Sequence, residues 1–246
     1  MDPKLRFSSR VENYIKYRPR YPQEIIEFLI KKKILKKDFV IADIGSGTGI
    51  LSNLFLENGN IVYGVEPNKD MRTAAENFLK NYPNFISIDG SAEDTGLKDK
   101  TIDMITAGQA FHWFNIVKTK EEFRRILKQA GWVVLIWNNR KRNSPGFPGD
   151  YEQLILKYGK DYKQIKSRAT NIDKFFKYQK VVFPNHQDVN IEEFKGRINS
   201  TSYIPLKNEP IYKKMIIEFE KLFNKYQENE ILRIEYDTEI YYGMLT

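Results

Sequence analysis

One segment early in the chain constrains the fold more than any other. Residues 39–51 have the sequence FVIADIGSGTGIL, an apolar run that ends in Asp43 and is followed by Gly45, Gly47 and Gly49. A short apolar run, a glycine cluster and a second apolar segment together predict a buried strand, a tight turn and a helix. Glycine lets a ligand approach the backbone where a Cβ would clash. The segment therefore predicts a nucleotide-type cofactor site in an α/β fold.

The glycine spacing and two acids select among cofactors. A dinucleotide-binding turn has the spacing G-x-G-x-x-G and directs a helix N-terminus at a pyrophosphate. This turn has G-x-G-x-G, and Asp43 stands directly before it, where it would repel a pyrophosphate but suit a cation. The next predicted strand, 61–66, ends in Glu66, where an acid can bind ribose hydroxyls. The two acids favour S-adenosylmethionine, which carries an ammonium, a sulfonium and a ribose diol. The alternative is a plain Rossmann-like turn in which Asp43 caps the helix.

Five segments in order resemble the class I S-adenosylmethionine-dependent methyltransferases. The glycine turn, Glu66 and the sequence DGSAE at 89–93 match the general family. The sequences YIKYRPRYP at 14–22 and GQAFHWF at 108–114 are similar to those of small-molecule methyltransferases of the trans-aconitate methyltransferase-like group, methyltransferase type 11. The resemblance covers roughly residues 8–140. It implies a Rossmann-like sheet of seven strands, helices on both faces and methyl transfer as the activity.

The resemblance also implies which residues bind the cofactor. The glycine turn would face the methionine part, Glu66 would hold the ribose hydroxyls, and the residues at 91–93 would flank the adenine. Met71 would pack on the adenine face, or else lie in the core of a predicted helix at 68–80. The full implied set is Tyr14, Tyr17, Asp43, Gly45, Ser46, Gly47, Gly49, Glu66, Pro67, Met71, Ser91, Ala92, Glu93 and Gln109.

Candidates for catalysis and acceptor binding are fewer. His112 could act as a general base if an acceptor hydroxyl must lose a proton, although a hydrogen-bonded wall histidine is the more frequent case. Arg18 could bind the carboxylate of the cofactor or of an acidic acceptor, because a guanidinium pairs bidentately with carboxylates. The alternative for Arg18 is a surface residue packed on tyrosines. Arg140 and Arg142 could also receive an anionic acceptor. Aromatic faces attract cations, so Trp113 and Phe114 are candidates to stabilise the sulfonium, with Phe111 packed inward.

Hydrophobic periodicity gives the remaining architecture. Strands are expected near 39–44, 61–66, 84–88, 102–106 and 132–137, with helices between them, including one that opens with a capping box at Thr119 and Glu122 and ends at Gly131. Such alternation predicts parallel β-α-β units. We expect three regions: a core with an N-terminal lid at 1–140, a helical cap at 141–180, and residues 181–246 completing the sheet with an antiparallel last strand.

Composition excludes several classes of function. The chain has no cysteine and two histidines, so we expect neither a disulfide nor a metal site. It has no apolar signal segment and no run near the roughly 20 apolar residues that span a bilayer. A cytoplasmic location and no membrane partner are therefore expected. The net charge of +8 comes from scattered lysines without a compact basic stripe, so nucleic-acid binding is not expected.

These observations predict an S-adenosylmethionine-dependent methyltransferase acting at oxygen of a small acidic or hydroxylated metabolite, as a monomer or homodimer. Two alternatives remain open. One is methylation of a nucleic acid or protein by the same fold, although the chain lacks an Asn-Pro-Pro-Tyr or Asp-Pro-Pro-Tyr segment for a flipped base. The other is a non-catalytic cofactor-binding module, since fold does not fix function. An NAD-dependent oxidoreductase is a more distant alternative, disfavoured by the glycine spacing and Asp43.

Overall fold

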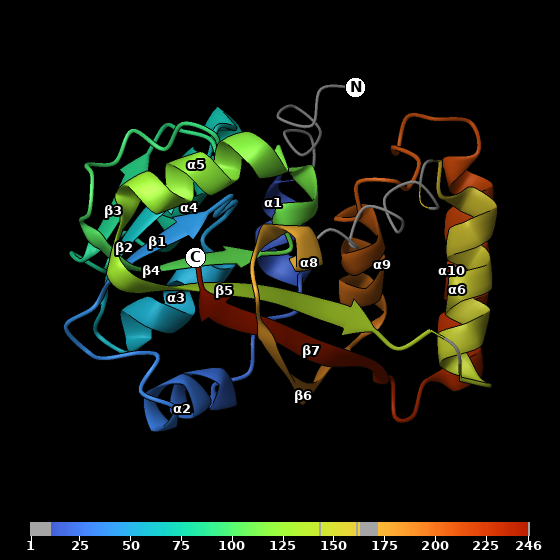
Figure 1. Ribbon diagram of the computed structural model, residues 1–246. Coiled ribbons are helices and arrows are strands. Elements are labelled where there is room, and N and C mark those ends of the chain that lie inside the picture. Colours follow the sequence, from blue (N-terminus) through green and yellow to red (C-terminus); the bar gives the residue numbers. More distant parts are fainter. Residues whose placement is uncertain (1–10, 143, 161, 163–171, 246) are drawn as a thin grey trace.

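The central element of the protein is a sheet of seven strands, seen in a computed structural model that describes residues 11–142, 144–160, 162 and 172–245. The order across the sheet is β3-β2-β1-β4-β5-β7-β6. Neighbouring strands from β3 to β5 are parallel, whereas β7 is antiparallel to both β5 and β6. The predicted Rossmann-like fold with an antiparallel last strand is confirmed (Figure 1). The strands are β1 (Val40–Ile44), β2 (Ile61–Val65), β3 (Phe85–Ile88), β4 (Ile102–Gly108), β5 (Leu127–Arg140), β6 (Gln179–Val189) and β7 (Leu232–Met244).

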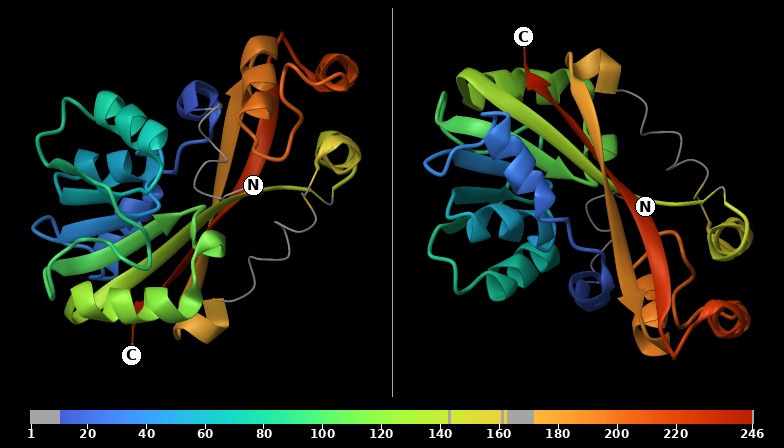
Figure 2. Two further views of the ribbon diagram at one scale, coloured as in Figure 1. Left: turned by 90° about the horizontal axis from the view of Figure 1, so that it is seen from above. Right: turned by 90° about the horizontal axis from the view of Figure 1, so that it is seen from below.

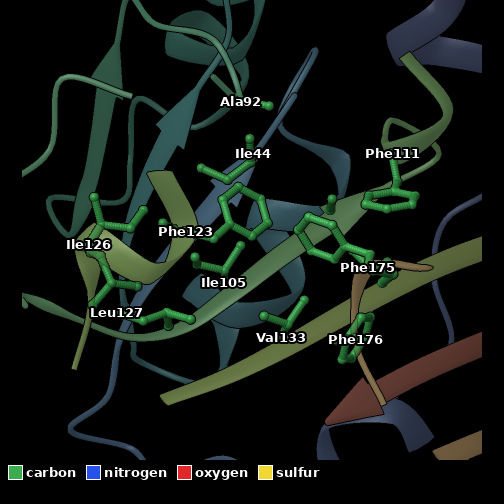
Figure 3. Packing of buried hydrophobic residues seen from close by; sticks show 14 of the residues in the cluster. Ile44, Ala92, Ile105, Phe111, Phe123, Ile126, Leu127, Val133, Phe175 and Phe176 are labelled. Carbon is green, nitrogen blue, oxygen red and sulfur yellow. The ribbon is translucent and has the colours of Figure 1, made fainter. Parts of the chain in front are cut away.

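Helices cover both faces of this sheet, because each central strand is apolar on both sides. On one face, α2 (Glu24–Lys31), α3 (Ile50–Glu57) and the end of α4 (Lys69–Phe78) share a hydrophobic core with the sheet. On the other face, α5 (Ile116–Ile126) and α8 (Ile172–Phe175) do so. Phe123 and Phe175 meet there edge to face at 5.6 Å, above Ile105 and Val133 of the sheet (Figure 3).

A third core lies beyond the far ends of β6 and β7. It joins α6 (Phe147–Tyr158), α9 (Ile191–Asn199) and α10 (Tyr212–Tyr226). These helices stand apart from the sheet-covering helices, on the right in Figure 1, and Figure 2 shows the same separation from two other sides. The helical region therefore extends past the expected 141–180, because α9 and α10 share one core with α6, over residues at the ends of β6 and β7. The expected helical content within 161 and 163–171 lies outside the described residues.

Helix α1 (Val11–Tyr17), in the segment that we expected to form a lid, lies between the sheet and α9 (Figure 1). A Cβ added to Gly196 of α9 would overlap the ring of Tyr17, so the two helices are in close contact. The last residue of α1 is also bound to β6, because Gln187 Nε2 donates to the Tyr17 carbonyl at 3.0 Å. The N-terminal segment thus connects the sheet to the helical region.

The helix before β5 departs from its predicted bounds. It begins after Asn115, whose side chain accepts from the backbone N–H of Lys118, so the capping box expected at Thr119 and Glu122 is wrong. Glu122 instead accepts from Thr95 and pairs with Arg125 at 2.7 Å. The helix ends at Ile126 and β5 begins at Leu127, earlier than expected. Across the described part of the chain, no helix has the length and apolarity needed to cross a membrane.

Candidate functional site

Two adjoining cavities lie where the carboxyl ends of the parallel strands meet, the usual place for ligands in open α/β sheets. The first, of about 250 Å³, is called the acidic cavity and is lined by Glu66, Met71, Glu93 and their neighbours. The second, of about 240 Å³, is called the arginine cavity and is lined by Arg18, Arg140, Arg142 and Arg197 together with Asp43. They share six lining residues, Tyr14, Gly45, Gly47, Gly108, Gln109 and Trp113.

The glycine turn follows β1 and forms part of both cavities. Gly45 and Gly47 have φ angles of 67° and 57°, a left-handed backbone that favours glycine. A Cβ on Gly45 would lie 2.7 Å from Cβ of Ala110, whereas one on Gly47 would meet nothing nearer than Cε of Met71 at 3.8 Å. The turn is thus closely packed at Gly45 and open toward the acidic cavity at Gly47.

Asp43 is the last polar residue of β1 and is fully buried. Its Oδ2 accepts from Ser52 Oγ at 2.6 Å, and its Oδ1 has no hydrogen-bond partner among the described residues. Burial, together with the charge of Glu66, raises the pKa of Asp43 to about 7. Asp43 does not cap α3, because the N-cap residue of that helix is Gly49. A buried, unsatisfied carboxylate oxygen in a cavity suits a cationic partner.

Glu66 follows β2 and faces the glycine turn. Its carboxylate accepts from the backbone N–H groups of Gly47 at 3.0 Å and Asn68 at 2.9 Å. Burial raises the pKa of Glu66 despite these two hydrogen bonds. Asn68 caps α4 by accepting from the N–H of Met71, which places Met71, only 5% exposed, at the wall of the acidic cavity.

The loop after β3 closes the other side of the acidic cavity, which Ser91, Ala92 and Glu93 line. Glu93 accepts from the backbone N–H of Asn115 at 2.8 Å, so the loop is tied to the start of α5. Asp89 lies outside both cavities, exposed and paired with Arg72 at 2.7 Å.

The segment after β4 forms the boundary between the cavities. Gln109 has a φ of 57°, and its side chain donates to the Asn138 carbonyl at 3.2 Å. The 3₁₀ turn η3 (Phe111–Trp113) follows. Phe111 packs inward, as predicted, and its ring centroid lies 4.9 Å from that of Phe175. His112 lines the arginine cavity with its ring 4.7 Å from that of Trp113, and Phe114 lines the acidic cavity.

The structure brings most of the predicted site residues together. Tyr14, Gly45, Gly47, Glu66, Pro67, Met71, Ser91, Ala92, Glu93 and Gln109 line the acidic cavity, and Arg18, Asp43, Ser46 and His112 line the arginine cavity. Two do not line either cavity. Gly49 begins α3, where a Cβ would lie 2.6 Å from Cδ1 of Leu79, and Tyr17 faces α9.

Sequence reasoning missed part of the arginine cavity. Arg197 of α9 is 8% exposed and donates to Thr201 Oγ1 at 3.0 Å and to the Tyr236 hydroxyl at 3.3 Å. Tyr162 and Tyr203 also line the cavity. Glu152 of α6 pairs with Arg140 at 2.6 Å and accepts from Tyr162 at 2.9 Å. These residues come from distant segments with no shared motif, so only the tertiary structure identifies them.

Comparison with known proteins adds independent information. Residues 42–135 match the family model described as a methyltransferase domain. An uncharacterized methyltransferase from Mycobacterium tuberculosis is 30% identical over 179 residues, which are 73% of this chain and 69% of that protein. An uncharacterized methyltransferase-like protein from Schizosaccharomyces pombe is 25% identical over 240 residues, 94% of this chain and 92% of that protein. The solved structure of a provisionally assigned type II methyltransferase from Anaeromyxobacter dehalogenans has a TM-score of 0.71 at 19% identity, covering 93% of this chain and 98% of that one.

Proposed function

Because the chain belongs to the class I S-adenosylmethionine-dependent methyltransferases, we propose that it methylates an oxygen of a small acidic or hydroxylated metabolite. The observation that carries the proposal is the pair of adjoining cavities, one suited to the cofactor and one to an acceptor. A cavity of about 240 Å³ is at the small end of ligand sites and favours a compact acceptor over a flipped base or a protein segment.

The residues of the acidic cavity, together with Asp43 of the adjoining arginine cavity, fit S-adenosylmethionine. The carboxylate of Glu66 would accept from the ribose hydroxyls, and the unsatisfied Oδ1 of Asp43 would accept from the ammonium. Met71 and Ala92 offer apolar contact for the adenine. When bound, the cofactor supplies a methyl group already activated on a sulfonium. The protein residues then have to position the acceptor and exclude water.

The boundary between the cavities is where we expect methyl transfer. The cofactor would supply the methyl group there: the acceptor oxygen would form the new bond to the methyl carbon as the sulfur–carbon bond breaks, with its electron pair left on sulfur. The rings of Trp113 and Phe114 lie at this boundary or beside it, where aromatic faces stabilise positive charge. A carboxylate acceptor has no proton to lose, so His112 would then serve as a wall residue rather than as a base.

The cofactor assignment can be tested by calorimetric titration of S-adenosylmethionine and S-adenosylhomocysteine. One-site binding is expected for the wild type, and about tenfold or greater weakening for Glu66→Ala, since a charged hydrogen-bond acceptor is removed. Glu121→Ala is the matched control, because Glu121 is an exposed acid on α5. Absence of binding to the wild type would overturn the proposal and direct the test to nicotinamide dinucleotides. Salt-dependent binding of DNA or RNA would instead favour a nucleic-acid acceptor.

A further inference from the structure

We propose that Arg18 and Arg197 form an anion subsite that holds a carboxylate or phosphate group of the acceptor, distinct from the oxygen that is methylated. The inference rests on the proposed function and concerns the end of the arginine cavity that α1 and α9 enclose. It names the charge of the acceptor and the two residues that recognise it. Arg197 has no role in any sequence motif.

The charges around the arginine cavity are unbalanced. Four guanidinium groups line the arginine cavity, against one carboxyl group in its lining, that of Asp43. Within the part of the chain that the structure describes, Glu152 is the carboxylate paired with this group of arginines. A concentration of like charges around a small cavity is unfavourable unless an anion joins them.

Arg140 is already neutralised by a carboxylate. Its guanidinium pairs with Glu152 at 2.6 Å and lies over the ring of Tyr151 at 4.2 Å. Arg142 shares the same carboxylate at 3.9 Å. Glu152 offsets one of these two charges, whereas no carboxylate among the described residues pairs with Arg18 or Arg197, which therefore hold most of the excess positive charge.

Arg18 and Arg197 are incompletely paired. Arg18 donates to the Ser200 carbonyl at 2.9 Å, and its buried Nε has no partner among the described residues. Arg197 donates to Thr201 Oγ1 and the Tyr236 hydroxyl, both uncharged acceptors. Neither forms an ion pair with a carboxylate in the described ranges. Burial and then the positive charge of Arg197 lower the pKa of Arg18. The pKa of Arg197 is raised despite its burial, because tyrosine hydroxyls, first that of Tyr236, surround it.

The chemistry of the ligand follows from these groups. Guanidinium groups bind carboxylates and phosphates through paired, charge-assisted hydrogen bonds. The acceptor must also reach Gln109 and Trp113, which border the acidic cavity. It therefore carries an anionic group at one end and a separate nucleophilic oxygen at the other. Tyr14 stacks on Arg18 at 4.7 Å and lines both cavities, so the same lid residue contacts both halves of the site.

The subsite can be tested with two simple probes. Succinate and inorganic phosphate would be titrated, at constant ionic strength against sodium chloride, into the full-length protein saturated with S-adenosylhomocysteine. Saturable binding of at least one probe is expected in the wild type. Arg197→Met should weaken it by about tenfold or more, the usual effect of losing a charged hydrogen-bond donor. Arg233→Met is the matched control, because Arg233 carries the same charge in a surface pair with Asp188.

Two further variants keep the test decisive. Arg197→Lys, which keeps the charge but not the paired donors, should bind with intermediate affinity. Arg18→Met, at the residue after α1, should reproduce the loss if Arg197→Met does not fold. The stronger of the two probes shows whether the group is a carboxylate or a phosphate.

Three outcomes would overturn the subsite. In the first, neither probe binds although S-adenosylhomocysteine does. In the second, binding of the probes is unchanged in both methionine variants. In the third, the variants weaken S-adenosylhomocysteine as much as the probes, which assigns the arginines to the cofactor carboxylate. Failure of S-adenosylhomocysteine to bind the wild type would count against the proposed function itself.

Discussion

Replacing Asp43 by asparagine is expected to stabilise the protein as the pH rises, although Asp43 belongs to the candidate cofactor site. The carboxylate is fully buried, with one oxygen bound to Ser52 and the other without a partner among the described residues. Such a group is costly to ionise in the folded state. Asparagine has nearly the same shape, can still accept from Ser52, and has no charge to bury.

The magnitude follows from the pKa of Asp43, which burial raises from 3.8 to about 7. Between these values the folded protein holds the proton and the unfolded chain has released it. Stability from the neutral carboxyl group is therefore complete below about pH 4 and is lost as the pH rises through 7. A shift of about three units at about 1.4 kcal/mol each gives a cost of about 4 kcal/mol at pH 8. The same relation gives about 2 kcal/mol at pH 5.

The assay is urea denaturation of wild type and Asp43→Asn at pH 5, 6, 7 and 8, followed by tryptophan fluorescence. The free energy of unfolding of the variant, minus that of the wild type, should rise by about 3 kcal/mol over this range. If the amide of the asparagine variant had no hydrogen-bond partner, the variant would be less stable by about 1–3 kcal/mol at every pH. The dependence of the difference on pH would stay the same. The control is Asp188→Asn, because Arg233 lowers the pKa of Asp188 and the difference should then be flat above pH 5. A flat difference for Asp43→Asn as well would refute the reasoning.

Three other predictions concern the same site. The affinity for S-adenosylhomocysteine, measured by calorimetry, should rise about tenfold from pH 6 to pH 8, because its ammonium needs ionised Asp43. Asp43→Asn should show no such rise. An equal rise in this variant would contradict the assignment of Asp43 to the ammonium. The free energy of unfolding in urea should be about 1–3 kcal/mol lower for Gly45→Ala than for Gly47→Ala. Both glycines have a positive φ, but only a Cβ at Gly45 would collide with Ala110. Equal free energies of unfolding would show that this contact relaxes freely. With an identified carboxylate acceptor, His112→Ala should lower kcat less than tenfold, whereas a general base would cost about a hundredfold or more.

The sheet could be predicted from the sequence because its signals are local. Apolar runs of strand length, each followed by a turn and a helical stripe, give β1 to β5 in order. The glycine turn and Glu66 mark strand ends, and parallel strands bring their carboxyl ends to one edge. This is why residues as far apart as Gly47 and Glu66 could be expected together, and the structure joins them at 3.0 Å.

The boundary of α5 could not be predicted in the same way. Thr119 and Glu122 have the spacing of a capping box, but that spacing also occurs inside helices. Glu122 is satisfied by Thr95, 27 positions away in the chain, and Asn115 takes the capping role. A local pattern was overruled by a tertiary contact that sequence periodicity does not contain.

The acidic cavity could be predicted from local sequence patterns, whereas much of the arginine cavity could not. This difference has a functional consequence. The acidic cavity is built mainly from strand ends and the turns directly after them. The arginine cavity adds Arg18, Arg197 and Tyr162, which α1, α9 and the segment after α6 bring from distant parts of the chain. We therefore expect substitutions in the third core to change acceptor binding more than cofactor binding. Because Tyr14 lines both cavities and stacks on Arg18, an anion at Arg18 should also hold the lid over the cofactor. Such coupling is reciprocal in binding free energy, so a bound acceptor should raise the affinity for the cofactor product.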